Sequence, residues 1–253
     1  RSALQFLVAI PGELVGTDVD VDPDAELSGV YRHVGAGGTC LRPTRKGPAM
    51  LFNKVKGFEN FRVAIGLLST RQRVGRLLGC APERRGFLLK DSVRNPIPPV
   101  VVGPEKAQCQ EIVHLASDPA IEIAACFEPP TTPQGFDELQ IAGAIRGRPV
   151  ELSRCLTINE RAIAHAEIVI EGELLPNVRV REDQNTDTGK AMPEFPGYTG
   201  EAKAALPVIK VKAVTHRRNP ILQTTIGPSE EHVNLAGIPT EASILDMVGR
   251  AMP

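Results

Sequence analysis

Short runs of β-branched residues, bounded by glycine and proline, fill the second half of the chain and constrain its fold most. In the clearest run, from Val208 to His216, the sequence VIKVKAVTH alternates apolar and polar side chains as a half-buried strand does. Glycine (23) and proline (22) are frequent enough to supply turns between such runs. Short, regularly spaced strands predict an antiparallel barrel or sandwich. The strands predicted here are 111–115, 121–127, 150–155, 166–171, 177–181, 207–215 and 221–226.

The first half instead mixes strand-like and helix-like segments, which predicts an α/β domain over residues 1–105. Ser69 or Thr70 is suited to cap a helix that Gly79 would end. The proline-rich connector NPIPPVVVG (95–103) then leads to a β-rich domain over 106–237. The predicted strands of the first half are 18–24, 49–53 and 62–67. The predicted helices of the whole chain are 25–33, 70–78, 136–145 and 240–252, the last capped by Thr240, while 3–10 is a helix or a strand.

Composition excludes several classes of protein. The formal net charge is −1, which gives no sign of a nucleic-acid or membrane-surface partner. No apolar run approaches the roughly 20 residues that a bilayer span needs. The five cysteines are scattered and form no CxxC pair, which indicates reduced thiols in a cytoplasmic protein and neither a disulfide framework nor a zinc site. They are Cys40, Cys80, Cys109, Cys126 and Cys155.

The loop TGKAMPEFPGYTGEA, from Thr188 to Ala202, presents a glutamate in an unusual setting. Pro193 and Pro196 bracket Glu194 and Phe195, so the backbone is restricted to one shape. A carboxyl group beside an aromatic ring can have its pKa raised toward neutrality and then act as a proton donor. The alternative, and the commoner case for this composition, is a surface loop with a solvated glutamate.

Other candidate residues also have a plain structural explanation. Glu138 follows Asp137 where a helix is predicted to begin, and both acids could simply favour the helix dipole. His232 follows two glutamates, Glu230 and Glu231, and could be a surface histidine. Three arginines on the helix over 70–78 could bind phosphate or lie on a solvated face; they are Arg71, Arg73 and Arg76. The glycine cluster 35–38 fits no phosphate-binding motif and is interpreted as a turn.

Several stretches together resemble the UbiD family of non-oxidative decarboxylases, which use prenylated FMN. The wider pattern is most similar to the branch that acts on protocatechuate (3,4-dihydroxybenzoate), gallate and related hydroxybenzoates. The stretches that carry the resemblance are AEIVIEGELLP (166–176), PEFPGYTGEA (193–202), PPTTPQGFDELQIAGAI (129–145), HRRNPILQTTIGPSEEH (216–232) and the VKG turn with the arginine-bearing helix that follows it.

The resemblance implies a reaction and a set of site residues. It implies reversible removal of CO2 from a hydroxybenzoate, with protocatechuate to catechol first, and gallate, 4-hydroxybenzoate or vanillate as alternatives. Glu194 would handle the proton and His232 would lie near the substrate. Glu138 would bind a divalent metal, Mn2+ first, that holds the flavin phosphate, with K+ as a further ion. The cofactor-binding residues would be Thr131, Thr132, Pro133 and Glu138.

The resemblance also carries expectations about fold, partners and length. The β-rich domain would be a flavin-binding split β-barrel-like domain, and residues 238–253 would begin a linker helix to a missing C-terminal domain. A homodimer or higher oligomer is implied, with a flavin prenyltransferase as the source of the cofactor. A family segment would be missing between Ala116 and Ser117, and Gly189 replaces a second glutamate of many relatives. A non-catalytic binding module of the same fold is the alternative class.

Overall fold

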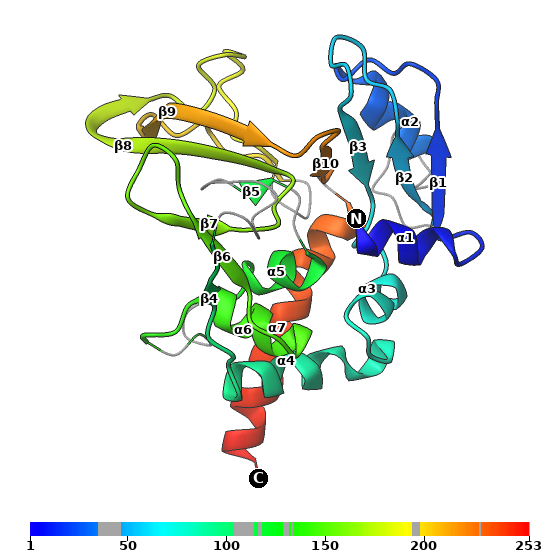
Figure 1. Cartoon of the computed structure of the whole chain (residues 1–253), viewed down its shortest axis with the longest axis vertical. Coiled ribbons are helices and arrows are strands. Elements are labelled where there is room, and N and C mark those ends of the chain that lie inside the picture. The colour runs from blue at the N-terminus through cyan, green and yellow to red at the C-terminus, as the bar shows by residue number, and fades with distance from the viewer. Residues whose placement is uncertain are drawn as a thin grey trace.

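The computed structural model describes residues 1–34, 47–103, 114–115, 118–128, 132, 134–193, 198–227 and 229–252. A small sheet with two helices lies on one side, a long two-stranded ribbon lies on the other, and further helices lie below both (Figure 1). The expected mixed α/β class is confirmed. The described strands form three separate sheets and no closed barrel.

The first sheet has the order β1-β2-β3-β10. Its strands are β1 (Leu14–Thr17), β2 (Ala49–Phe52), β3 (Arg62–Ile65) and β10 (Ile221–Thr224). β1 pairs with β2 in parallel, β2 with β3 antiparallel, and β10 with β3 in parallel. The helices α1 (Ser2–Val8) and α2 (Glu26–Val34) accompany this sheet. Through β10, a strand from late in the chain completes the sheet that the first residues begin.

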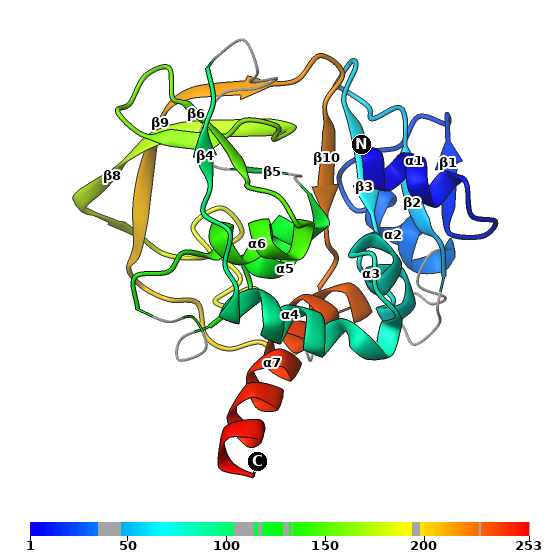
Figure 2. The ribbon, with the colours of Figure 1, turned by 60° about the horizontal axis from the view of Figure 1, so that its bottom comes forward.

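A group of helices lies beneath the sheets and holds the main apolar core (Figure 2). Leu68, Leu89, Ile123, Ile141 and Ile238 are fully buried there. Its members are α3 (Arg71–Leu77), the 3-10 turn η1 (Pro82–Arg84), α4 (Arg85–Arg94), α5 (Pro119–Ala124), α6 (Glu138–Arg146) and α7 (Glu230–Ala251).

The other two sheets have the orders β4-β6-β7 and β5-β8-β9. β8 and β9 pair antiparallel along most of their length, with irregularities between Glu171 and Gly172 and between Leu175 and Arg179. The resulting ribbon extends away from the helices (Figure 1). The strands are β4 (Val100–Val101), β5 (His114–Leu115), β6 (Glu151–Arg154), β7 (Arg161–Ile163), β8 (Ile168–Val180) and β9 (Leu206–His216).

Several predicted elements are confirmed, and others are corrected. The helices over 25–33, 70–78 and 136–145 correspond to α2, α3 and α6, and Thr70 caps α3 by accepting the N–H of Arg73. The strand predicted for 121–127 is wrong, because Asp118 caps a helix there and Pro119 occupies its first position. The strands predicted at 166–171 and 177–181 belong to one strand, β8.

Two further predictions, the strand at 18–24 and the helix start at Thr240, are wrong in position. The strand expected at 18–24 is absent, and the edge strand of the sheet is β1, a few residues earlier. Thr240 does not cap a helix: α7 starts at Glu230 after Ser229, and the Thr240 hydroxyl donates to the carbonyl of Ala236 at 2.8 Å within that helix. None of the helices in the described part of the chain has the length and apolar character that crossing a bilayer requires.

Candidate functional site

His232 lies in the first turn of α7, where the turn before the helix fixes its position. The Ser229 hydroxyl accepts the N–H of His232 at 3.3 Å and caps the helix. A Cβ atom on Gly227 would lie 3.2 Å from His232 Nδ1 and 4.0 Å from the carbonyl oxygen of Pro193. The imidazole and the residue just before Glu194 therefore both lie close to Gly227. The structure thus brings one end of the predicted catalytic loop to the predicted catalytic histidine.

The base of this loop is closed by backbone hydrogen bonds. Ala191 N–H donates to Gly200 O, and Ala202 N–H donates to Gly189 O, both at 3.1 Å. The Glu182 carboxylate accepts two more amides at the base, from Met192 at 3.4 Å and Lys203 at 3.0 Å. These bonds hold the two sides of the loop together at its base; Glu194 itself lies outside the described residues.

Tyr198 and Gly189 flank the part of the loop that carries Glu194. Tyr198 is 78% exposed. At Gly189 the backbone φ is +68°, in the left-handed region that favours glycine. The backbone shape at this position therefore disfavours the second glutamate that many relatives are expected to carry.

Glu138 is the first residue of α6 and directly follows the capping residue Asp137. The Asp137 carboxylate accepts the N–H of Gln140 at 3.1 Å. No described residue forms a hydrogen bond or ion pair with the Glu138 carboxylate. In the preceding segment, the Thr132 hydroxyl is buried and has no hydrogen-bond partner among the described residues. A buried orphan hydroxyl is costly, and an oxyanion ligand would satisfy it. These features fit a phosphate-bearing cofactor; Thr131 and Pro133 lie outside the described residues.

The described residues alone do not make a metal centre. No group of three or more His, Cys, Asp or Glu among them could hold a metal ion. Glu138 would therefore provide one ligand of a site that needs others. No hydrogen bond or ion pair joins Glu138 to His232, which lies on a different helix.

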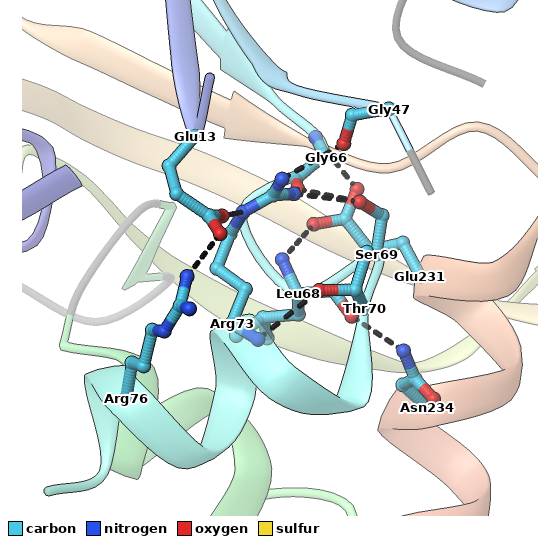
Figure 3. Close-up of polar contacts among 10 residues, drawn as sticks. All are labelled: Glu13, Gly47, Gly66, Leu68, Ser69, Thr70, Arg73, Arg76, Glu231 and Asn234. Carbon is cyan, nitrogen blue, oxygen red and sulfur yellow. Dashed lines mark hydrogen bonds and ion pairs between the residues drawn. The ribbon is translucent and has the colours of Figure 1, made fainter. Parts of the chain in front are cut away.

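The three arginines of α3 all pair with carboxylates, Arg71 with Glu241 and the other two with Glu13, and one of the three is buried. Arg73 is only 2% exposed and is bound on several sides. Its Nε donates to Glu13 at 2.6 Å, and Nη1 and Nη2 donate to the carbonyls of Gly66 at 2.7 Å and Gly47 at 2.8 Å. Arg76 also pairs with Glu13 (Figure 3). Arg73 is thus a buried residue that joins three segments of the chain. The positions of the three arginines in the sequence do not reveal that one of them is buried.

A polar hollow at the other end of α6 is separate from the predicted site. Arg146, at the last position of α6, lines it together with His165 and Glu167. Its charges pair among themselves: Glu167 accepts from Arg1 at 2.8 Å and contacts Arg217 at 3.4 Å. Burial works to raise the pKa of Glu167, but the hydrogen bonds from Arg1 and the Ile221 amide outweigh it and lower that pKa. We assign no chemistry to this hollow.

Sequence reasoning missed Glu231, the residue next to His232. Its side chain is fully buried, and its carboxylate accepts the backbone amides of Gly66 at 2.8 Å and Leu68 at 2.7 Å (Figure 3). Burial raises the pKa of Glu231 to about 7, against the opposing effect of those two hydrogen bonds. Acids in the first turn of a helix are common, so the sequence carries no signal that this one is buried.

Comparison with known proteins assigns the chain to a family. The 3-octaprenyl-4-hydroxybenzoate carboxy-lyase N-terminal domain matches residues 7–91, and the Rift-related domain of the same carboxy-lyases matches residues 104–230. The gallate decarboxylase of Lactiplantibacillus plantarum is 42% identical over 340 residues, which cover 100% of this chain and 69% of that protein. The chain belongs to the UbiD family.

Solved structures of UbiD-type enzymes have the same fold. The apo 3,4-dihydroxybenzoic acid decarboxylase from Enterobacter cloacae aligns with a TM-score of 0.91 and 44% identity, over 100% of this chain and 70% of that one. The UbiD-class enzyme HmfF from Pelotomaculum thermopropionicum, in complex with prFMN, aligns with a TM-score of 0.82 and 25% identity, over 99% of this chain and 72% of that one.

The length of the alignment bears on the expected missing segment of this UbiD chain. The match to the gallate decarboxylase runs over 340 positions, whereas this chain has 253 residues. That relative therefore has residues without a counterpart here. The expected place of the gap, after Ala116, lies outside the described residues and stays a prediction.

Proposed function

We propose that this chain catalyses the reversible, non-oxidative decarboxylation of a hydroxybenzoate, with protocatechuate to catechol as the first choice. The observation that carries the proposal is the likeness to the Enterobacter cloacae 3,4-dihydroxybenzoic acid decarboxylase over the whole chain, at 44% identity and a TM-score of 0.91. The likeness to a gallate decarboxylase, at 42% identity, favours gallate as the second candidate substrate.

In this proposal two side chains act on the substrate. The bond between the ring carbon and the carboxylate breaks, CO2 leaves, and Glu194 delivers a proton to the ring carbon, so no oxidant or reductant is consumed. His232 hydrogen-bonds a phenol oxygen or assists its deprotonation. The closeness of Pro193 and His232 to the same point beside Gly227 supports a shared site for the two.

Prenylated FMN supplies the electron sink when it is bound. The segment with Thr131, Thr132 and Pro133 would hold it. The Thr132 hydroxyl, which is buried and has no partner among the described residues, supports that role. Glu138 would provide one carboxylate ligand to a divalent metal, with Mn2+ first and K+ as a further ion. The remaining ligands must come from outside the described set.

The proposal extends to the setting of the enzyme. A cytoplasmic homodimer or higher homo-oligomer is expected, supplied with its cofactor by a flavin prenyltransferase. The free thiols of Cys80, Cys126 and Cys155 agree with a reducing compartment. Burial raises the pKa of the Cys126 thiol, which keeps it in the unreactive form.

The test is turnover of matched substrates by protein loaded with prenylated FMN and Mn2+. CO2 release is measured from 3,4-dihydroxybenzoate, from gallate and from benzoate, which lacks the ring hydroxyls. We expect release from the first two and none from benzoate. Flavin that stays bound through gel filtration without any CO2 release would favour the non-catalytic binding module.

A further inference from the structure

Glu231 ties the first turn of α7 to the loop between β3 and α3. Its two carboxylate oxygens accept different amides, those of Gly66 and Leu68, and the side chain of Asn234, one turn later, donates to the Leu68 carbonyl at 2.8 Å. All three bonds are buried (Figure 3). The helix that carries His232 is therefore fastened at its start to a segment more than 160 residues earlier.

The loop that receives these bonds is itself held firmly. The Gly66 carbonyl accepts from Arg73 Nη1 at 2.7 Å and from the Ser69 hydroxyl at 2.9 Å. Arg73 also donates to Gly47, just before β2, and to Glu13, just before β1, so it joins the loop to the starts of both strands (Figure 3). Both backbone groups of Gly66 are therefore hydrogen-bonded: its N–H donates to Glu231, and its carbonyl accepts from Arg73 and Ser69.

Because Glu231 and His232 are consecutive residues of one helix, the bonds that fix Glu231 also fix the direction of His232. Consecutive residues of an α-helix project about 100° apart around its axis. With Glu231 directed into the β3–α3 loop, His232 must point to a different side, and it does so toward Gly227 and Pro193. Rotation of the first turn would move both side chains together.

We propose that Glu231 is a positioning residue that holds His232 against Gly227 and the Pro193 end of the catalytic loop. The inference rests on the proposed function, because it gives His232 a task in the reaction. The hydrogen bonds of the Glu231 carboxylate to other described residues go to backbone amides, so in this proposal it acts through His232. The simpler alternative is that the carboxylate only satisfies two buried amides and contributes stability.

A double-mutant cycle separates these roles, with protein loaded with prenylated FMN and 3,4-dihydroxybenzoate as substrate. The variants are Glu231→Gln, His232→Gln and the pair. The matched control is Glu171→Gln: Glu171 is also fully buried and also accepts two backbone amides, from Leu156 at 2.9 Å and Thr157 at 2.5 Å. Thermal unfolding is measured for each variant beside kcat.

We expect Glu231→Gln to lower kcat about tenfold in the native background and less than twofold in the His232→Gln background, since coupled residues are non-additive. Glu171→Gln should cost stability and leave kcat within about twofold. An equal loss of kcat in both backgrounds, or an equal loss from Glu171→Gln, would overturn the proposal. If Glu231→Gln does not fold, Asn234→Ala loosens the same clamp, and the same cycle applies.

A readout without turnover keeps this proposal separate from the proposed function. The nuclear Overhauser effect between the His232 ring protons and the Gly227 Hα protons reports the packing directly. We expect it to weaken in Glu231→Gln and persist in Glu171→Gln. Its persistence in both variants would contradict the positioning role, whatever the enzyme turns over.

Discussion

Glu231 and Leu68 are separated by 163 residues of sequence, yet the Glu231 carboxylate accepts the Leu68 amide at 2.7 Å in the interior of the protein. The same carboxylate accepts the Gly66 amide, so two segments from opposite ends of the chain meet at one buried charge. This junction holds the first turn of α7, which carries His232, against the loop between β3 and α3.

The first prediction concerns the pH dependence of stability. Because burial raises the pKa of Glu231 from 4.5 to about 7, the folded state binds more protons than the unfolded state between these pH values. The contribution of Glu231 to the free energy of unfolding is therefore present in full below pH 4.5, falls as the pH rises to about 7, and is constant above it. The decrease is about 3 kcal/mol. The charged and titratable neighbours that face it are Arg73 and Tyr31, whose own pKa is raised by burial and by Glu231 to about 12.

Urea unfolding at pH 5 and pH 7.5 measures this contribution. Glu231→Gln should lose less stability between the two pH values than the parent protein, whereas Glu173→Gln, on the exposed ribbon, should follow the parent. Parallel curves for the parent and Glu231→Gln would show that Glu231 titrates at an ordinary pH.

The second prediction concerns Gly66. Its φ is +80°, and an added Cβ would lie 2.6 Å from the hydroxyl oxygen of Tyr31, which is buried. Gly66→Ala should therefore cost about 3 kcal/mol, from backbone strain together with overpacking. Gly79→Ala is the matched control, because φ is +71° and nothing lies within 4 Å of the added Cβ. It should cost only about 1 kcal/mol, and equal losses for the two variants would remove the role of Tyr31.

The third prediction concerns the cofactor. Glu138→Gln should abolish retention of flavin while the far-UV circular dichroism stays that of the parent, because a ligand must carry charge to hold a metal. Asp137→Asn removes a charge one position away and keeps a good helix cap, so it should retain flavin. Flavin absorbance and Mn2+ content after gel filtration measure both. Retention by Glu138→Gln would return Glu138 to a role at the helix dipole.

Local signals account for the elements that the sequence predicted correctly. The Thr70 and Asp137 caps mark the starts of α3 and α6, and both side chains accept the backbone N–H expected of a cap. The failure at 121–127 has an equally local cause. Ile121 and Ile123 resemble strand residues, but the Asp118 cap, Pro119 and burial of the segment decide for a helix.

Contacts between distant segments explain what could not be predicted. The pairing of β10 with β3 and the clamp of Glu231 on Gly66 join residues more than 150 positions apart. No local pattern marks Glu231 as buried or Arg73 as internal, since both occur on helices in ordinary polar sequence. The place of His232 beside Pro193 also depends on the fold, although both residues were singled out for other reasons.

CO2 release from 3,4-dihydroxybenzoate, by parent and Glu194→Gln proteins loaded with prenylated FMN, tests the central claim most directly. Glutamine keeps the size of the side chain but cannot deliver a proton. The account predicts that the parent releases CO2 and that the variant keeps its flavin and loses turnover by a factor of roughly 100 or more. Turnover of the variant within a few-fold of the parent, or no release by the flavin-loaded parent, would contradict it.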